Sequence, residues 1–527
     1  MIKLKSKPPS RSRRKSERWL ILLLVAAPLA GLVVERWRGQ WALYNWKQEM
    51  ATNGESLAIA PLWPLISAEA VSFSNQLAQI VDHFPAPLRA YVGNLSPLTL
   101  TESGKALRGS QATCPPLTSR TPDPDQSNTW KRLDALLHES EPALEQLRAL
   151  MMHAPAGVDY DAATVLDGVA PPNFVAHRIA AQTLHASALN NLHQGDLTRA
   201  TQDLAALLAF GKLGNQDPGL VAFMIRMAII GLSIDVCWDA LQSADWTEPQ
   251  LAALQTHCLD ITNLLSQLPH TMEAERVTRI HELDWFRSHS YQEWVARYSE
   301  MYAGFGLQPP PSDAGPATLF RRQWLFHPIW SFAWADQEEL KYLQAVQLEL
   351  TALRETAHKS SYQWLQEQIT ANRHHYRPPA IAVRFYGQLP LADRFLEVVG
   401  PPTIPGSAYP YPDFSKAWFI CLKNLTLHEM VITAIALKRH NLRYSQPASS
   451  LATLVPEFLS AEPIDLMDGH PLRYQLNSAG VHVLYSIGAN LRDDRDEDVA
   501  SSNPGDQTER SPWRQRDWVW PQSGVNP

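Results

Sequence analysis

The feature that most constrains the fold is a run of sixteen uncharged, mostly aliphatic residues, Trp19 to Val34, directly after a basic segment. Residues 1–18 contain eight lysine and arginine residues and a single acidic one. The run is slightly shorter than the roughly 20 residues that a helix needs to cross a bilayer. The basic flank should stay in the cytoplasm, with the rest of the chain outside. The sequence therefore predicts a single-pass protein of the cytoplasmic membrane with its N-terminus inside.

Aromatic residues follow the apolar run. Trp37, Trp41 and Tyr44 match the aromatic belt that marks a membrane–water interface. We therefore expect a transmembrane anchor over residues 19–37, continued by an amphipathic helix that ends near residue 53. A cleaved signal peptide is the alternative, because small residues before Gly31 resemble a cleavage site.

The charge of the remaining chain excludes one class of partner. The whole protein has 46 basic and 53 acidic residues, so removing the basic N-terminal segment leaves a strongly acidic remainder. Proteins that bind nucleic acids need a basic surface, so we expect no nucleic-acid partner. The expected partners are the membrane, through the N-terminal helix, and an envelope protein that the sequence does not identify.

Cysteine spacing excludes two structural classes. The four cysteines, Cys114, Cys237, Cys258 and Cys421, are far apart and include no Cys-x-x-Cys pair. This pattern fits neither a disulfide-rich scaffold nor a zinc ribbon. A bridge between Cys237 and Cys258 is conceivable in an oxidising compartment, although both also suit apolar helix faces.

Hydrophobic periodicity and clusters of proline indicate a mainly α-helical protein of several parts. The expected fold has one N-terminal transmembrane helix, an exported helical body and a small C-terminal α+β module with a short antiparallel sheet. The parts are predicted as a cytoplasmic tail, an anchor, a mixed connecting region, the helical body, a Pro/Tyr-rich connection, the module and a C-terminal tail (residues 1–18, 19–37, 38–128, 129–375, 376–415, 416–500 and 501–527).

Two segments of the body have distinct patterns. Residues 186–210 predict two helices joined at Gly195-Asp196, and the order of small and large residues resembles one tetratricopeptide hairpin. Residues 220–234 are strongly apolar with Arg226 in the middle. Fifteen residues around a central charge favour a buried core helix over a second membrane span.

The C-terminal module begins with a predicted helix over residues 416–441, whose basic end, Lys438-Arg439-His440, suits the negative end of the helix dipole. A short helical turn near residues 451–456 follows. Residues 472–476 and 481–487 then predict a β-hairpin.

Several stretches of this part carry a resemblance: Thr433 to Arg439, Leu451 to Phe458, Pro463 to Tyr474, Leu484 to Asn490, Asp493-Asp494 and Asp517 to Pro521. On these residues the chain resembles a family of membrane-anchored bacterial proteins that has no established activity. The module is also similar in layout to the globular part of type II secretion major pseudopilins. There a helix, a Pro-Asp loop and a small sheet end in a calcium-binding loop, so the resemblance implies calcium as the one cofactor to expect.

The chain departs from these families in two respects. It lacks a prepilin leader of the Gly-Phe-x-x-x-Glu kind, and its membrane segment lies far from the module, so it is not itself a pilin. Arg495-Asp496 also stand where family members often have two glycines.

An acidic run could hold a hard cation. Calcium prefers six to eight oxygen ligands, which carboxylates supply. The candidate ligands are Asn490, Asp493, Asp494, Asp496 and Asp498, with Asp465 or Asp468 approaching across the hairpin. The run lacks the glycine and glutamate of an EF-hand loop. A solvated acidic loop is the competing interpretation.

No local motif predicts catalysis. His428-Glu429 begins like a zinc-protease helix but lacks the second histidine, and the chain has no Gly-x-Ser-x-Gly motif. Paired carboxylates such as Glu338-Glu339 are explained as solvated helix faces. We therefore expect a scaffold or interaction protein at the outer face of the membrane, near secretion or pilus-like machinery. An envelope hydrolase with its site in the helical body and a helical-repeat adaptor remain the alternatives.

Overall fold

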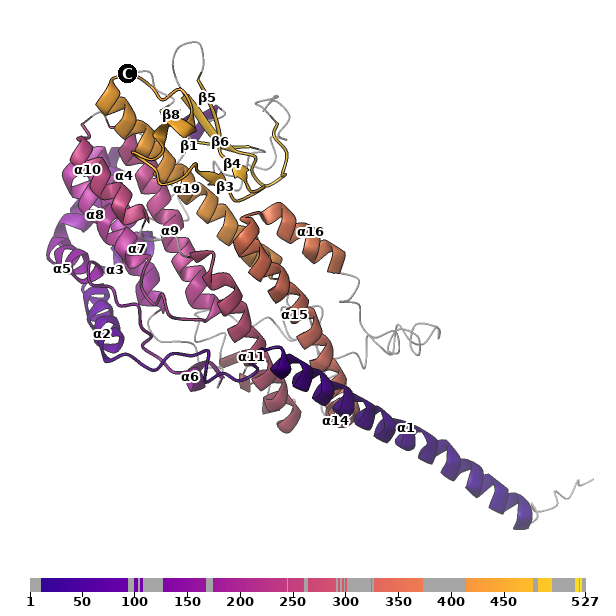
Figure 1. Ribbon diagram of the computed structural model, residues 1–527. Helices are drawn as coiled ribbons and strands as arrows, with labels where there is room; N and C mark the ends of the chain where they lie inside the picture. The colour runs from indigo at the N-terminus through magenta and orange to yellow at the C-terminus, as the bar shows by residue number, and fades with distance from the viewer. Residues whose placement is uncertain are drawn as a thin grey trace, which may run out of the picture. The chain divides into compact units, whose positions relative to one another are not determined.

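The computed structural model describes most of the chain. It covers residues 11–92, 99–102, 105–107, 127–166, 174–243, 245–259, 264–290, 292–293, 296–297, 299–300, 324, 327–372, 414–476, 482–494, 517–520 and 522–523. These residues form long helices and a few short strands (Figure 1), which confirms a mainly α-helical protein with small sheets. The predicted connection at residues 376–415 lies outside the described residues, apart from its last two.

Contacts divide the chain into two compact units, each built from separated stretches. The first unit comprises Met1–Ala58, Arg276–Gln347 and Arg373–Pro412, and the second comprises Ile59–Glu275, Leu348–Asn372 and Asp413–Pro527. Helices α11 (Gln267–Ser288) and α15 (Ala335–Lys359) contribute residues to both units.

The first unit is built around α1 (Arg11–Thr52) and α14 (His327–Ala333). Helix α1 is continuous over 42 residues, so the predicted anchor and the following helix are one element. Gly39 allows close packing against α15, because a Cβ there would lie 2.8 Å from the Cγ of Gln337. The helix ends as expected near residue 53, where Gly54 has a φ of 81°.

The carboxylates of Glu338 and Glu339 are not on a solvated face, so that prediction is wrong. Glu339 is buried and forms ion pairs with Lys47 at 2.5 Å and with Arg287 at 3.3 Å. Glu338 accepts a hydrogen bond from the indole of Trp330. Cations from other helices compensate the burial of Glu339, and the amino-acid sequence around Glu339 does not reveal these partners.

Most elements of the second unit are helices. They are α2 (Ala68–Asp82), α3 (Ala86–Tyr91), α4 (Ser127–Glu139), α5 (Glu141–Met151), α6 (Ala162–Leu166), α7 (Phe174–Gln194), α8 (Leu197–Phe210), α9 (Leu220–Leu241), α10 (Glu248–Leu259), α16 (Tyr362–Asn372) and α19 (Ser415–Tyr444). Helices α7, α8 and α9 pack on one another, and α19 packs on α9 and α10. The predicted hairpin is confirmed as α7–α8: Gly195 has a φ of 80°, and the carboxylate of Asp196 accepts a bond from Arg199 N–H at 3.0 Å.

Helix α9 is the apolar segment predicted as a helix, and Arg226 within it is buried. Helices α9 and α19 are the two in the described part of the chain that are long and apolar enough to cross a membrane. Much of each is buried within the protein, and each packs on the other. Burial of this kind is typical of core helices, as predicted for α9.

The predicted role of the basic end of α19 needs correction. Residues are buried around almost the whole circumference of α19, and the helix continues to Tyr444. Lys438 therefore does not lie at the end of its own helix. Its ammonium group donates to main-chain oxygens at the end of α9, and Arg439 pairs with Glu248 of α10.

Short strands complete the second unit. The predicted hairpin is confirmed as β5 (Arg473–Leu476) and β6 (His482–Ser486), which pair antiparallel with Arg473 opposite Tyr485. Strand β7 (Trp518–Val519) adds to β6, and β3 (Ile464–Asp465) pairs with β4 (His470–Pro471). A second three-stranded sheet joins β1 (Thr99–Glu102), β2 (Lys105–Leu107) and β8 (Gln522–Ser523), with β8 parallel to β2. The short turn near residue 451 is a 3-10 helix, Leu451–Leu454.

Candidate functional site: a polar cavity in the helical body

The strongest candidate site is a small cavity within the second unit. It encloses about 40 Å³ and lies between α2, residues 157–160, α7, residues 213–217 and α9. Its polar lining consists of Ser74, Asp159, Tyr160, His177, Asp217 and Arg226. These residues come from distant parts of the sequence, so the fold alone brings them together.

The turn at residues 155–160 is fixed by main-chain contacts on both sides. Ser67 N–H donates to Val158 O at 2.9 Å, and Gly214 N–H donates to Pro155 O at 3.0 Å. Gly157 is required for this approach, because a Cβ there would lie 2.7 Å from the Cβ of Ser67. The turn is therefore held rigidly at the edge of the cavity.

A tyrosine–aspartate pair forms one wall. The hydroxyl of Tyr160 donates to Asp217 at 2.6 Å, and the second carboxylate oxygen accepts from Gly219 N–H at 2.8 Å. Burial raises the pKa of Asp217 to about 6, although the bond from Tyr160 acts in the opposite direction. Burial and the neighbouring carboxylate also raise the pKa of Tyr160, so the phenol stays protonated.

Arg226 lines the cavity, and one edge of its guanidinium group has no hydrogen-bond partner. Its Nη1 donates to the side-chain oxygens of Asn215 at 3.0 Å and Gln267 at 2.9 Å. Its Nε and Nη2 are buried and have no hydrogen-bond partner. Among the described residues, no carboxylate forms an ion pair with Arg226. The Nε–Nη2 edge is the one that binds carboxylates through two parallel hydrogen bonds.

His177 and Asp159 also present unpartnered atoms. The Nε2 of His177 and the Oδ2 of Asp159 are buried without a hydrogen bond. The ring of His177 lies between the rings of Phe174 and Phe210, with centroids 5.9 and 5.8 Å away. Burial lowers the pKa of His177 to about 4, against the opposing charge of Asp159, so the imidazole is neutral at pH 7.

Four unpartnered buried atoms around one cavity are unusual. In folded proteins about 90% or more of buried polar groups have a hydrogen-bond partner in the protein or in ordered water. A buried guanidinium edge without a partner carries the largest desolvation cost of the four. The arrangement is therefore typical of a site that receives a polar molecule.

Ser74 lines the same cavity, which raises the question of nucleophilic catalysis. A serine nucleophile needs a base within hydrogen-bond distance. The Nε2 of His177 bonds to no group, so it is not paired with Ser74 in this structure. Binding, rather than covalent chemistry, is what the geometry supports directly.

Of the predicted calcium ligands, Asp496 and Asp498 lie outside the described residues. Asn490 donates to Asp494 at 2.5 Å, and Tyr485 donates to Asp493 at 3.4 Å. In the described part of the chain, no three His, Cys, Asp or Glu side chains converge to hold a metal ion. The calcium site remains a prediction.

The expectation that Asp465 or Asp468 approaches the acidic run as a ligand is not met. Asp465 is buried and accepts bonds from Met467 N–H, Ile487 N–H and the hydroxyl of Ser486 at 2.9 to 3.0 Å. Both carboxylates are also paired with Arg473. Their oxygens hold the module together and are not available to a cation.

The cysteines that the structure describes are free and buried: Cys237, Cys258 and Cys421. Cys237 and Cys258 lie close enough to shift each other's pKa, so the two candidate partners of a bridge are neighbours but remain thiols. The ring of His428 belongs to the buried core. The second histidine of a zinc-protease motif is lacking, as the sequence already shows.

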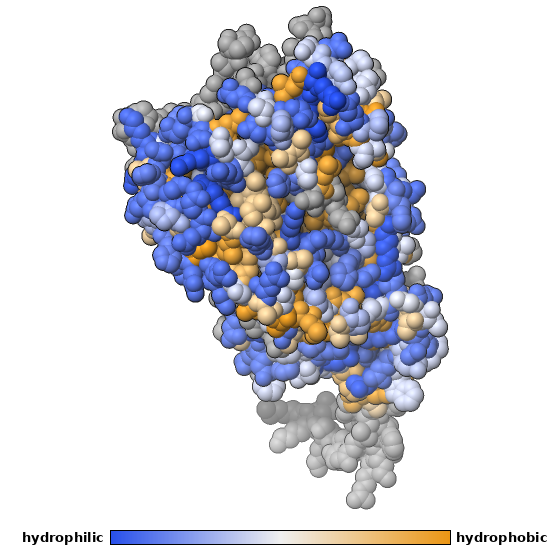
Figure 2. Space-filling model, turned by 60° about the vertical axis from the view of Figure 1, so that its left-hand side comes forward, coloured by the Kyte–Doolittle hydropathy of each residue, from blue (hydrophilic) through white to orange (hydrophobic). Residues whose placement is uncertain are grey.

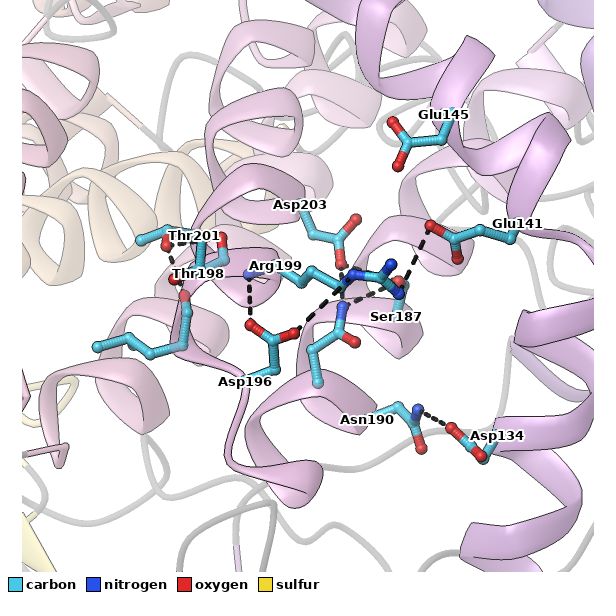
Figure 3. A network of polar contacts seen from close by, with 12 residues as sticks. Asp134, Glu141, Glu145, Ser187, Asn190, Asp196, Thr198, Arg199, Thr201 and Asp203 are labelled. Atoms are coloured by element: carbon cyan, nitrogen blue, oxygen red, sulfur yellow. Dashed lines mark hydrogen bonds and ion pairs between the residues drawn. The ribbon is translucent and has the colours of Figure 1, made fainter.

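A second polar cluster in the same unit is centred on the buried ion pair of Arg148 and Asp203 (Figure 3). Arg148 of α5 donates to Asp203 of α8 at 2.7 Å and to Glu141 at 3.0 Å. Asp203 also accepts from Ser187 and Asn191 of α7, both at 2.8 Å. Both carboxylate oxygens of Asp203 are hydrogen bonded, so neither is available to a ligand. The cluster joins three helices and is therefore structural.

The chain matches no protein-family model, no curated protein and no solved structure. The resemblance of the C-terminal module to pseudopilins therefore rests on the sequence alone and remains a prediction. The function of the cavity is likewise inferred from the chemistry of its lining residues.

Proposed function

We propose that this protein is anchored in the cytoplasmic membrane by residues 19–37 and that its helical body, outside the membrane, binds a small polar ligand. The observation that carries the binding function is the set of buried, unpartnered polar atoms of Arg226, Asp159 and His177 around one cavity. A ligand that supplies the missing hydrogen bonds would bind only the folded state.

The form of α1 supports the anchor. The apolar run continues without a break into a helix whose Trp37, Trp41 and Tyr44 are 73%, 70% and 62% exposed. These residues are four and three apart and so share one helical face. Leu43 and Met50 are buried instead. Exposed aromatic residues directly after an apolar run suit the interfacial layer of a bilayer.

An interaction role is the further part of this proposal. Figure 2 shows apolar residues at the surface among hydrophilic ones, and a contiguous patch of such residues is what docking to a partner requires. The resemblance to pseudopilins supports a position near secretion or pilus-like machinery. A ligand-binding body held at the membrane could then act as a scaffold for an envelope protein.

The anchor is tested by fractionating cells that express the full chain and a chain lacking residues 1–37. The full chain should resist extraction by alkaline carbonate and dissolve in detergent, whereas the truncated chain should be soluble. A reporter fused after residue 527 should be active outside the cytoplasm. Carbonate-soluble full chain would refute the anchor.

The binding function is tested by thermal unfolding of the detergent-solubilised full chain with a panel of small neutral, anionic, cationic and zwitterionic molecules. A true ligand should raise the midpoint, and Ala222→Leu, which fills the cavity, should abolish the rise. Ala253→Leu on the exposed face of α10 is the matched control. If no member of the panel acts through the cavity, the function is refuted.

A second candidate is the envelope hydrolase. Ser74, His177 and Asp159 line the same cavity, and catalytic hydrogen bonds often form only when substrate binds. Turnover of small ester or amide substrates that is lost in both Ser74→Ala and His177→Gln would favour it. Retained turnover in either variant would eliminate this arrangement as the catalytic one.

A further inference from the structure

The charges around the cavity define the chemistry of its ligand. One positive group, Arg226, presents its free Nε–Nη2 edge, while Asp159 presents a free carboxylate oxygen. Asp217 adds a second carboxylate, but both of its oxygens are occupied by Tyr160 and Gly219. The free groups are therefore one cation, one anion and the neutral imidazole of His177.

Neither a simple anion nor a simple cation fits this set. An anion on Arg226 would place further negative charge beside Asp159 and Asp217, and like charges at short range are unfavourable. A cation on Asp159 would leave the buried edge of Arg226 unpartnered. A molecule with a carboxylate at one end and an ammonium group at the other satisfies both groups without adding net charge.

We propose, on the basis of the ligand-binding function above, that the cavity binds the head group of a small α-amino acid. The carboxylate accepts two parallel hydrogen bonds from Nε and Nη2 of Arg226, and the ammonium group donates to Asp159. The Nε2 of His177 accepts a hydrogen bond from the ammonium group in the tautomer that protonates Nδ1.

The size and lining of the cavity restrict the side chain of this ligand. A volume of about 40 Å³ corresponds to about three water-sized groups, which suits a head group and little more. The apolar part of the lining, Leu213, Ile225 and Ile229, would contact a hydrogen atom or a methyl group beside it. Glycine and alanine are therefore the expected size class.

The experiment measures the unfolding midpoint of the detergent-solubilised full chain in millimolar glycine, alanine, glycinamide, acetate and ethylamine, with sodium chloride at matched ionic strength. Glycine or alanine should raise the midpoint by about 2 °C or more. Glycinamide and ethylamine lack the carboxylate and should not act. Acetate lacks the ammonium group and should act much more weakly.

Two variants test the assigned contacts. Arg226→Lys keeps the charge but loses the two-donor edge, and Asp159→Asn removes the anion at a half-buried position where folding should be preserved. Each should weaken apparent glycine affinity about tenfold or more. Arg148→Lys changes a buried arginine whose partners are already complete, so glycine should still raise its midpoint.

The outcomes separate this inference from the function on which it rests. Equal action of glycine and acetate, or of glycine and glycinamide, would overturn the amino-acid head group while leaving a ligand-binding cavity. Glycine binding that persists in Asp159→Asn would overturn the ammonium contact. If none of these five compounds acts through the cavity, the inference fails, while the proposed function is decided by the wider panel described above.

Discussion

The ammonium group of Lys438, in α19, lies 2.8 Å from the main-chain oxygen of Leu241 and 2.6 Å from that of Ser243, at the C-terminal end of α9. The last carbonyl groups of a helix have no partner within the helix and carry a partial negative charge. A lysine from a neighbouring helix therefore completes the end of α9. This contact joins two core helices that are almost 200 residues apart in the sequence.

Replacing Lys438 by methionine should reduce the free energy of unfolding by about 1–2 kcal/mol, because two charge-assisted hydrogen bonds are lost while the aliphatic stem is kept. Urea unfolding measures the change. Arg443→Met is the control, since its pair with Glu457 is exposed and should contribute less than about 1 kcal/mol. Equal effects in the two variants would contradict the capping role.

Replacing one partner of the ion pair of Arg148 and Asp203 should cost more stability than replacing both partners. Arg148→Met leaves the buried carboxylate without its cation and should cost about 3–5 kcal/mol. Asp203→Asn should also destabilise, because asparagine lacks the charge that the arginine needs. The double variant should lose less than the sum of the two single losses. Additive losses would mean that the two side chains do not act as a pair.

In acid, the free energy of unfolding should depend on the protonation of His177. Its folded pKa of about 4 lies below the unfolded value near 6.5, so between these pH values the unfolded chain binds more protons. His177 therefore stabilises fully above pH 6.5 and less as the pH falls towards 4. Urea unfolding gives the free energy of unfolding at each pH. Between pH 7 and pH 4.5 this free energy should fall by about 2 kcal/mol less in His177→Gln than in the wild type.

The other titratable groups at the cavity must be separated from this effect. Asp159, Tyr160 and Arg226 face the same space, and the raised pKa of Asp217 acts with the opposite sign, since stability from its protonated form is lost as the pH rises through about 6. These groups are present in both proteins, so their contributions largely cancel in the comparison. Identical acid profiles would show that His177 titrates normally.

The acidic run should respond to calcium if the predicted site exists. Thermal unfolding of the full chain in millimolar calcium should occur at a higher temperature than in excess chelator, because a cation at 100 times its dissociation constant stabilises by roughly 2.7 kcal/mol. Magnesium should not replace it. The rise should disappear in a variant with Asp493→Asn and Asp494→Asn. No shift in the wild type would make the run a solvated loop.

The sequence predicted elements well where the pattern was local. The hairpin at Gly195-Asp196, the helix around Arg226 and the strands on either side of residues 477–480 all follow from periodicity and turn residues. It failed where partners are distant. Glu338 and Glu339 were expected in solvent because their partners, an indole for Glu338 and two cations for Glu339, are distant in the sequence. Lys438 was assigned to its own helix.

The sequence could not predict the cavity either, because its lining residues come from distant parts of the chain. Only Arg226 was conspicuous, as a charge within an apolar helix. Asp159 and His177 lie in stretches without a recognisable motif, and their proximity depends on how α7 and α9 pack around the turn at Gly157. The turn residues Asp217-Pro218-Gly219 were a usable local signal, since they place a carboxylate just before an apolar helix.

The continuity of α1 has a consequence for how the protein meets its partners. The apolar run and the segment that packs on α14 and α15 are one helix, so the proposed anchor continues directly into the unit it belongs to. An anchored protein of this kind cannot reach far from the bilayer. If residues 19–37 lie in the membrane as proposed, the protein searches in two dimensions, and its encounters are with molecules that diffuse along the membrane surface or that are delivered to it.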